Sequence, residues 1–337
     1  MQRNQIYTVL KISAVLVIIS SVIVLALPYV FAITINHEQS FSTEMDLFPV
    51  TVDSKNKTIV EDAQVNAFLE SPSSPLQAAA GNTGETLWEI FAWVAKTING
   101  APWYQSIAAA GGRFVTITPG MRKEQVADAF AKTLSWNATQ KKEFMLATTS
   151  SQLPFLEGSF SPGTYVVSTG TTPGDARSLV NDRFTQDVLE HYGTTTAEMV
   201  PLDEALIIAS LIQRETIGTA DMRLVSGVIW NRLFAGMNLQ IDATLQYAKA
   251  NTPETSKWWP KVVPADTRRK SPYNTYLHQG LPPTPIANPS VAAIVAALNP
   301  IQTSCLFYFN DNAGDIHCTD TYAQHVALLK KYYGRGK

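Results

Sequence analysis

The sequence has little net charge, and this limits the kinds of protein it can encode. Its 337 residues carry 26 Lys and Arg against 28 Asp and Glu, which gives a formal net charge of −2, and 45% of them are hydrophobic. A disordered chain has fewer apolar residues, and a protein that binds polyanions is usually strongly basic. The composition therefore predicts a folded protein and gives no reason to expect nucleic acid as a partner.

Signatures of metal, nucleophile and phosphate sites are also lacking. His278, His317 and His325 are scattered, and no HExxH pair occurs. The two cysteines have no second Cys or His pair at ligand spacing. Ser210 is not in a nucleophile-elbow pattern, and the "PGM" and "TPGD" turns do not match phosphate-binding loops. We therefore expect neither a metal nor a cofactor.

A long apolar stretch without charge runs from Ile12 to Ile35. A helix needs roughly 20 apolar residues to cross the core of a bilayer, so this stretch predicts one transmembrane helix at 12–35. Arg3 and Lys11 precede it, and no Lys or Arg follows until Lys55. The positive-inside rule then predicts that residues 1–11 form a tail in the cytoplasm. The helix would lie in the cell (inner) membrane, and the rest of the chain would lie on the outer, periplasmic side.

A cleaved signal peptide is the alternative for this N-terminus. The letters "VFA" at 30–32 loosely fit a cleavage site with small residues. The apolar stretch is longer than the core of a usual signal peptide, which favours an uncleaved anchor.

The two cysteines, Cys305 and Cys318, flank a segment that is typical of two short strands around a turn at "NDNAG". Pairing the strands about that turn places the cysteines roughly opposite each other. An exported domain permits a disulfide, so we predict a bridge between them. Two reduced, half-buried thiols are the alternative, and the sequence leaves both open.

The rest of the chain predicts an α+β protein with three parts. Residues 36–112 are interpreted as a linker and a poorly defined exported segment. Residues 113–195 alternate strand and helix patterns, and residues 196–337 are mainly helical with one β-hairpin. In this last part, helices are expected at 201–215, 221–235, 289–298 and 320–333, with irregular polar structure over 237–248 and, because of five prolines, over 271–289.

Glu215 is the candidate for acid–base chemistry. It lies on the helical stripe formed by Ile208, Leu211 and Ile212, in the last turn of the helix expected at 201–215. Burial and the negative end of a helix dipole both raise the pKa of a carboxylic acid, and an acid that keeps its proton near neutral pH can act as a general acid. The alternative is a carboxylate at the edge of the helix that is turned to water or to an arginine.

Further polar and aromatic side chains occur without helical or strand patterning. Amides and hydroxyls suit the hydroxyl groups of a sugar, and tyrosine rings suit the apolar faces of sugar rings. We predict a sugar-binding groove formed by Asn231, Gln240, Asp242, Thr244, Tyr247, Tyr273, Asn274, Thr275 and Tyr276.

Several segments resemble, in order and spacing, the endolytic murein transglycosylase family of YceG-like, membrane-anchored enzymes. They are "ASLIQRET" at 209–216, "VSGVIWNRLFAGMNLQIDATLQYA" at 225–248, "SPYNTYLHQGLPPTPIANPS" at 271–290 and "AALNP" at 296–300. Upstream, "LEGSFSPGTYVV" resembles a further segment of the family, and "VTITPGMRKEQVADAF" resembles its LysM-like subdomain. The resemblance implies a LysM-like subdomain at 113–195 and a YceG-like catalytic domain at 196–337, and it does not extend to residues 60–112.

The resemblance also implies an activity. These enzymes cleave the β-1,4 bond between N-acetylmuramic acid and N-acetylglucosamine in peptidoglycan glycan strands without water, and they leave a 1,6-anhydromuramoyl end. The family's catalytic glutamate aligns with Glu215, while Gln213 stands where many relatives carry another acidic residue. A role in ending strand growth, with peptidoglycan synthases as partners, is implied as well.

Two other functions stay open at this point. A muramidase-type hydrolase would use Glu215 and Asp242 with water, since hydrolytic glycosidases normally employ two carboxyl groups. A non-catalytic scaffold would bind peptidoglycan through the LysM-like unit.

Overall fold

The computed structural model describes residues 48–71, 74, 76, 112–146, 156–250 and 257–334. The predicted tail at 1–11 and the predicted transmembrane helix at 12–35 lie outside these residues. Within the described ranges, no helix combines the length and apolar character needed to span a membrane. Helices and short strands both occur, so the predicted α+β class is confirmed.

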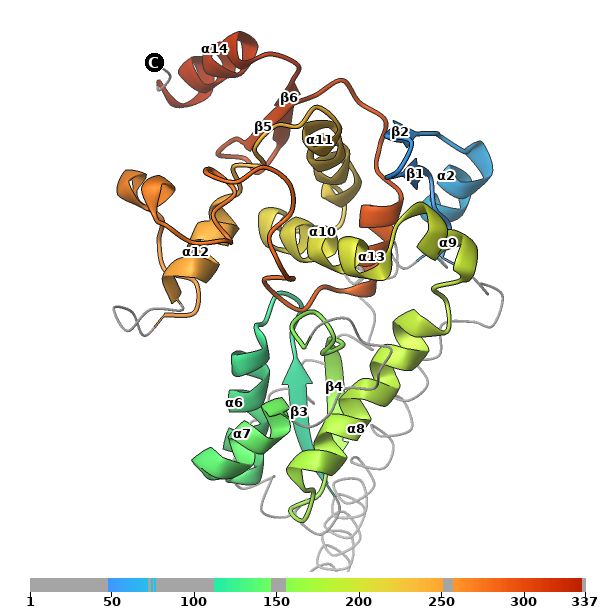
Figure 1. Cartoon of the computed structure of the whole chain (residues 1–337), viewed down its shortest axis with the longest axis vertical. Helices are drawn as coiled ribbons and strands as arrows, with labels where there is room; N and C mark the ends of the chain where they lie inside the picture. The colour runs from blue at the N-terminus through green and yellow to red at the C-terminus, as the bar shows by residue number, and fades with distance from the viewer. Residues whose placement is uncertain are drawn as a thin grey trace, which may run out of the picture. The chain divides into compact units, whose positions relative to one another are not determined.

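The elements keep the labels of Figure 1 throughout. In chain order they are β1 (Val52–Asp53), β2 (Thr58–Ile59), α2 (Ala63–Glu70), β3 (Arg113–Ile117), α6 (Lys123–Leu134), α7 (Ala138–Leu146), β4 (Gly163–Val167), α8 (Pro173–Phe184), the π-helical turn Thr185–Leu189, α9 (Thr194–Met199), α10 (Leu202–Glu215), α11 (Met222–Phe234), α12 (Asp242–Ala250), the 3-10 turn Pro264–Arg268, α13 (Val291–Leu298), β5 (Phe307–Asn310), β6 (Ile316–Thr319) and α14 (Tyr322–Tyr333).

The chain divides into two compact units. The described residues of the first are 112–115 and 164–171, which supply most of β3 and β4, and these strands form a two-stranded sheet. All other described residues belong to the second unit. The LysM-like subdomain expected at 113–195 stays a prediction.

The second unit contains helices whose faces follow the sequence pattern. α6 buries Val126, Phe130 and Leu134, which recur at helical spacing along one face. α7 places Phe144 against Phe130, with 4.9 Å between the ring centroids. At the start of α8, the hydroxyl of Thr172 accepts a hydrogen bond from the backbone N–H of Asp175 and so caps the helix.

The main core of the second unit lies among α10, α11 and α13, which pack against one another (Figure 1). α13 is almost wholly buried because Ala, Val, Ile and Leu cover its whole circumference. The indole N–H of Trp230 donates to the carbonyl of Ala297 at 2.9 Å. Gly227 lets the following chain approach α11, because a Cβ there would lie 2.3 Å from the carbonyl oxygen of Ile301.

Part of the segment expected as a linker packs into this core. Phe48 is 3% exposed and Val52 is fully buried, and both join the cluster formed around α10 and α13. The backbone N–H of Thr51 donates to the carbonyl of Leu298 at 3.0 Å. Within the interval 36–112, interpreted as a linker and a poorly defined exported segment, residues 48–71 thus carry enough apolar side chains to fold onto the helices.

The predicted irregular stretch at 237–248 is corrected at its second half. α12 begins at Asp242, a carboxylate in the first turn of a helix, where it complements the helix dipole. Asp242 is thus the start of a helix rather than the loop residue we expected. The stretch 271–289 contains no helix or strand, as the prolines predict.

The predicted hairpin is confirmed. β5 and β6 are antiparallel, and Tyr308 pairs with Cys318 in their register. Cys305 and Cys318 form a disulfide, so the chain just before β5 is bonded covalently to β6. The bridge closes a short loop around the hairpin and restricts how far β5 can move from β6.

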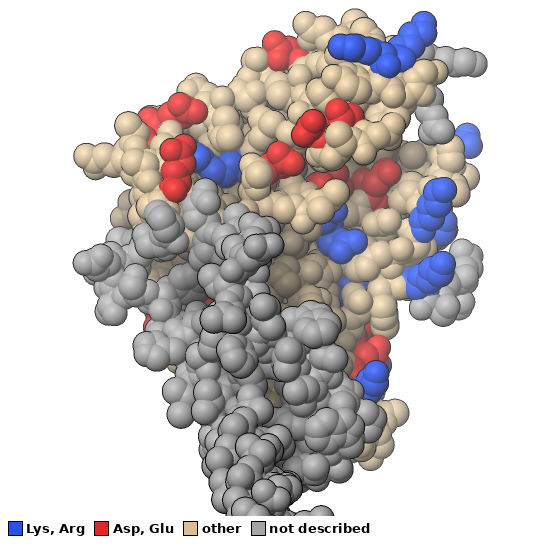
Figure 2. All heavy atoms as spheres, turned by 180° about the vertical axis from the view of Figure 1, so that it is seen from behind, with Lys and Arg blue, Asp and Glu red and all other residues tan. Residues whose placement is uncertain are grey.

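The surface shows no dominance of one charge. Figure 2 shows that lysine and arginine side chains and aspartate and glutamate side chains both occur on the described part of that face. This agrees with the formal net charge of −2 over the full sequence.

Asn288 connects three segments that are distant in sequence. Its Oδ1 accepts from the backbone N–H groups of Gly158, at 2.9 Å, and Phe160, at 3.0 Å. Its Nδ2 donates to the carbonyl of Met121 at 2.9 Å and to Glu157 at 3.2 Å. Burial raises the pKa of Glu157 to about 7. The proline-rich segment is thereby fixed to the loop before β4 and to the turn before α6.

We expect Asn288→Ala to lower the free energy of unfolding by about 2 to 4 kcal/mol, because two buried N–H groups lose their acceptor. Urea-induced unfolding followed by tryptophan fluorescence measures this. Asn312→Ala is the matched control, since Asn312 is exposed in the hairpin turn. Equal stability of the two variants would contradict the role given to Asn288.

Candidate active site

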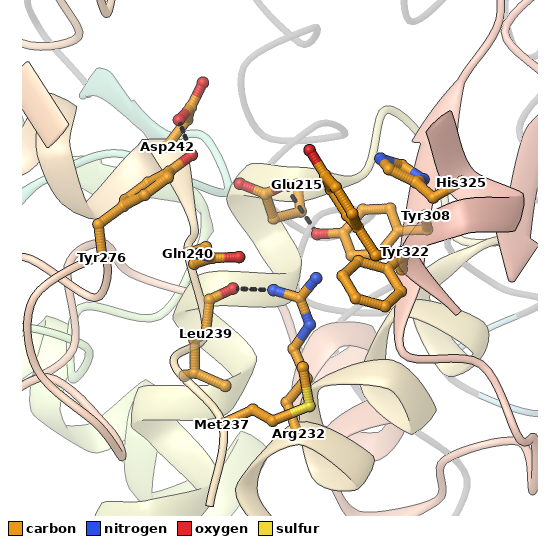
Figure 3. A pocket seen from close by; sticks show the side chains of 11 residues that line it. Glu215, Arg232, Met237, Leu239, Gln240, Asp242, Tyr276, Tyr308, Tyr322 and His325 are labelled. Carbon is orange, nitrogen blue, oxygen red and sulfur yellow. Dashed lines mark hydrogen bonds between the residues drawn. The ribbon is translucent and has the colours of Figure 1, made fainter. Parts of the chain in front are cut away.

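A cavity of about 660 Å³ opens where α10, α12, α14 and the hairpin come together (Figure 3). Four of the side chains that line it come from the predicted site, and the others do not. The lining residues are Glu215, Arg232, Met237, Leu239, Gln240, Asp242, Tyr276, Phe307, Tyr308, Tyr322 and His325.

Glu215 lies at the back of this cavity because it is the last residue of α10. The preceding residues Ile208, Leu211 and Ile212 are fully buried, so the apolar stripe leads directly to its carboxyl group. The hydroxyl of Tyr308 donates to Oε2 of Glu215 at 2.8 Å.

Several interactions act on the pKa of Glu215, and together they raise it. Burial is the largest cause, and the negative charge of Asp242 adds to it. The hydrogen bond from Tyr308, the backbone N–H of Ala243 and the charge of Arg214 act in the opposite direction. Ala243 is in the first turn of α12, so the positive end of that helix faces the carboxylate.

Tyr308 is a donor that does not itself ionise. Burial and the neighbouring charge of Glu215 raise the pKa of Tyr308 well above its usual value. Its proton therefore stays on the phenol throughout the neutral range. Because the hydroxyl always has a proton to donate, it stabilises the carboxylate of Glu215 relative to the protonated acid.

The opposite side of the cavity carries hydroxyl, amide and carboxylate groups. The hydroxyl of Tyr276 donates to Oδ1 of Asp242 at 2.7 Å. Gln240 has a φ of 51°, in the left-handed region that non-glycine residues rarely adopt, and its backbone N–H donates to the carbonyl of Thr275 at 3.0 Å. Such strained residues are concentrated at functional sites.

Arg232 connects the two sides of the cavity. Its Nε donates to the carbonyl of Leu306 at 2.6 Å, just before β5, and its NH1 group donates to the carbonyl of Leu239. The side chain is nearly buried, and its guanidinium lies 5.2 Å from the ring centroid of Phe307. The hairpin and the chain before α12 are thus held at a fixed distance.

The cavity brings together four of the predicted side chains, namely Glu215, Gln240, Asp242 and Tyr276. The other predicted residues do not line it, and their polar groups bind inside the protein. They are Asn231, Thr244, Tyr247, Tyr273, Asn274 and Thr275.

Two examples show why these residues cannot reach the cavity. The amide of Asn231 donates to the carbonyls of Thr303, at 2.6 Å, and Cys305, at 3.1 Å. Tyr247 is 2% exposed, with its hydroxyl 3.4 Å from Glu157 and the guanidinium of Arg122 over its ring. The amide of Asn231 and the hydroxyl of Tyr247, which we expected to bind a sugar, thus bind other parts of the protein.

Sequence reasoning missed the hairpin and α14 as parts of the site. Phe307, Tyr308, Tyr322 and His325 follow the other lining residues by 30 or more positions, and no periodic pattern connects them. Arg232 was passed over in favour of its neighbour Asn231. The signal that was present is the cluster of aromatic side chains beside a predicted disulfide.

No group of three or more His, Cys, Asp or Glu side chains that could hold a metal ion occurs in the described ranges.

Comparisons with known proteins agree on one family. The sequence model described as "YceG-like family" matches residues 83–331, which begins upstream of the resemblance noted at residue 113. A protein of Bacillus subtilis (strain 168) named "Endolytic murein transglycosylase" is 30% identical over 238 residues, which is 65% of this chain and 64% of that protein.

A second relative has the same printed name and comes from Streptococcus pneumoniae serotype 2 (strain D39 / NCTC 7466). It is 30% identical over 174 residues, which is 50% of this chain and 31% of that protein. This chain thus spans less than two thirds of the length of either relative. A crystal structure of a putative YceG-like protein from Listeria monocytogenes has the same fold, with a TM-score of 0.55 and 23% identity over 64% of this chain and 75% of that one.

We expect Tyr308→Phe to raise the pKa of Glu215 further, because the anion loses a donor while the protonated acid loses little. An NMR titration of the glutamate side-chain carboxyl carbons measures this, with Glu215→Gln to assign the signal. Tyr333→Phe is the control, since that hydroxyl bonds to the carbonyl of Asn310. An unchanged or lower pKa in Tyr308→Phe would refute the role given to the phenol.

Proposed function

Because this chain belongs to the YceG-like family, we propose that it is a peptidoglycan lytic transglycosylase that cuts glycan strands internally. The bond cleaved is the β-1,4 bond from N-acetylmuramic acid to N-acetylglucosamine, and the product is a 1,6-anhydromuramoyl end. The relatives named above support this class of activity. The observation that carries the proposal is Glu215, a carboxyl group with a raised pKa beside a permanent phenol donor in an open cavity.

The reaction needs one carboxyl group that acts twice. Protonated Glu215 donates its proton to the glycosidic oxygen as the bond from that oxygen to C1 of the muramic acid breaks. The carboxylate then accepts the proton of the C6 hydroxyl, whose oxygen bonds to C1 and closes the anhydro ring. Glu215 ends protonated, as it began, and no water is consumed.

The surroundings of Glu215 fit both halves of this cycle. Burial raises the pKa of Glu215 and so favours the protonated acid that the first step needs. The hydrogen bond from Tyr308 and the nearby guanidinium of Arg232 stabilise the anion that exists between the steps. A carboxyl group that is always ionised cannot donate the first proton, and one that is always protonated cannot accept the second.

A hydrolase is the second candidate, and the position of Asp242 favours it. Asp242 lines the same cavity, and its charge acts on Glu215. A muramidase would use this second carboxylate with water. In the lytic reaction Asp242 has the lesser task of orienting the substrate. A non-catalytic scaffold that binds peptidoglycan is the third candidate.

We also propose that residues 12–35 anchor the chain in the cell membrane by one helix, with residues 1–11 in the cytoplasm and the catalytic domain on the outer side. The uncharged apolar stretch and the position of Arg3 and Lys11 support this topology. A substrate on nascent strands beside the membrane, and peptidoglycan synthases as partners in ending strand growth, are part of the same proposal. Protease digestion of whole and opened cells shows on which side of the membrane each part of the chain lies. A domain that is cleaved from its N-terminus and released would contradict the anchor.

We expect the full chain to release fragments with anhydro ends from glycan strands, and Glu215→Gln to lower the rate by at least about a hundredfold, the scale lost when a general acid is removed. Mass spectrometry distinguishes anhydro ends from reducing ends by the mass of one water. Asp242→Asn tests the alternative, because a hydrolase would be nearly abolished and a transglycosylase only impaired.

Reducing ends from the wild type would replace the lytic reaction with hydrolysis. If the wild type cut no strand but still bound peptidoglycan, the scaffold would be the better description. The unfolding temperature of Glu215→Gln serves as control that loss of activity does not come from loss of the fold.

A further inference from the structure

The two sides of the cavity differ in their chemistry, and Glu215 lies between them. Figure 3 shows Asp242 and Tyr276 on one side, and Tyr308, Tyr322 and His325 on the other. The first side presents a carboxylate, a phenol and the amide of Gln240. The second presents aromatic rings, which come from β5 and the start of α14.

Tyr322 is the most exposed part of this aromatic side. Tyr322 is 61% exposed, whereas Tyr332 and Tyr333 of the same helix are each 36% exposed. Its ring contacts Phe307 at 5.8 Å between centroids, and Phe307 in turn lies 5.6 Å from His325. The three rings form a continuous aromatic wall beside Glu215.

The hydroxyl of Tyr322 also differs from those of the other tyrosines in the cavity. Tyr276 donates to Asp242 and Tyr308 donates to Glu215. Among the described residues, no hydrogen bond involves the hydroxyl of Tyr322. Contacts within the described part of the protein therefore account neither for the exposure of the Tyr322 ring nor for its unbonded hydroxyl.

The position of the wall is fixed by its surroundings. Tyr322 is the first residue of α14, directly after Thr321, whose side chain caps the helix together with Gln324. Phe307 is held by Arg232 and by the strand that the disulfide restrains. Burial and the charge of Arg232 lower the pKa of His325, which favours its neutral imidazole.

A pyranose ring is the ligand that this wall suits. One face of a β-linked hexosamine presents axial C–H groups, which pack on an aromatic ring, while its equatorial hydroxyl and acetamido groups take hydrogen bonds from phenol and imidazole edges. A ring lying on the wall would occupy the same cavity as Glu215.

We propose that Tyr322, with Phe307 and His325, forms a subsite for an N-acetylhexosamine ring of the glycan, on the side of Glu215 opposite Asp242 and Tyr276. The proposal rests on the proposed function, because it takes Glu215 to mark the bond that is cleaved. The aromatic subsite supplies binding through ring contact, and the polar side supplies hydrogen bonds to the adjoining sugar.

The test measures binding without cleavage. The full chain with Glu215→Gln, in mild detergent, is titrated by calorimetry with the β-1,4-linked pentamer of N-acetylglucosamine, which has the same ring faces and no peptide. Adding Tyr322→Ala is expected to weaken binding about tenfold, the size of one lost aromatic contact. Adding Tyr322→Phe, which keeps the ring, is expected to change affinity by less than about threefold.

Tyr333→Ala is the matched control, because Tyr333 is also a part-exposed tyrosine of α14 but does not line the cavity. Equal affinity of Tyr322→Ala and its parent would overturn the subsite, and so would a parent that does not bind the pentamer. Cleavage of glycan strands by the chain with Glu215 intact is scored separately. Strand cleavage with no dependence on Tyr322 refutes only the subsite, whereas Tyr322-dependent binding without cleavage refutes only the proposed activity.

Discussion

The site depends on one buried guanidinium. Arg232 donates to the carbonyl of Leu306 on the hairpin side and to the carbonyl of Leu239 on the side that leads into α12. A planar side chain with several donors in a fixed fork can hold two backbone segments in a defined geometry. Since α11 is packed into the core through Trp230 and its neighbours, both sides of the cavity are fixed relative to the core of the second unit.

The pKa of Glu215 is determined by opposing effects. Its helix is apolar enough to bury the carboxyl group, and burial dominates its pKa. The first turn of α12 and the phenol of Tyr308 oppose that effect with donors that carry no net charge. A lysine in their place would stabilise the anion far more strongly and would remove the acid. The same carboxyl group can therefore donate a proton and take one back.

The sequence predicted α10, α11, α13, α14 and the hairpin, and placed Glu215 in the last turn of α10, because these depend on local periodicity and on turn residues. α10 and α11 end within a residue or two of the expected limits. The aromatic side of the cavity could not be predicted in this way, since Tyr308 meets Glu215 only through the tertiary fold, 93 positions away. α12 was missed because its short polar sequence has no apolar stripe long enough to show helical periodicity.

The predicted residues that do not line the cavity still determine its shape. Thr275 accepts from the backbone N–H of Ile241 and, through its carbonyl, from that of Gln240. Asn274 accepts from the backbone N–H of Tyr276 at 2.9 Å. These bonds place Gln240 and Tyr276 at the cavity.

Asn231 binds the chain before the hairpin in the same manner. An amide or hydroxyl in a proline-rich loop satisfies the backbone groups that a helix or strand would otherwise pair, and this need competes with ligand binding for the same side chains. The sequence pattern therefore located the segments around the cavity, while burial decided which side chains in them remain free to face a ligand.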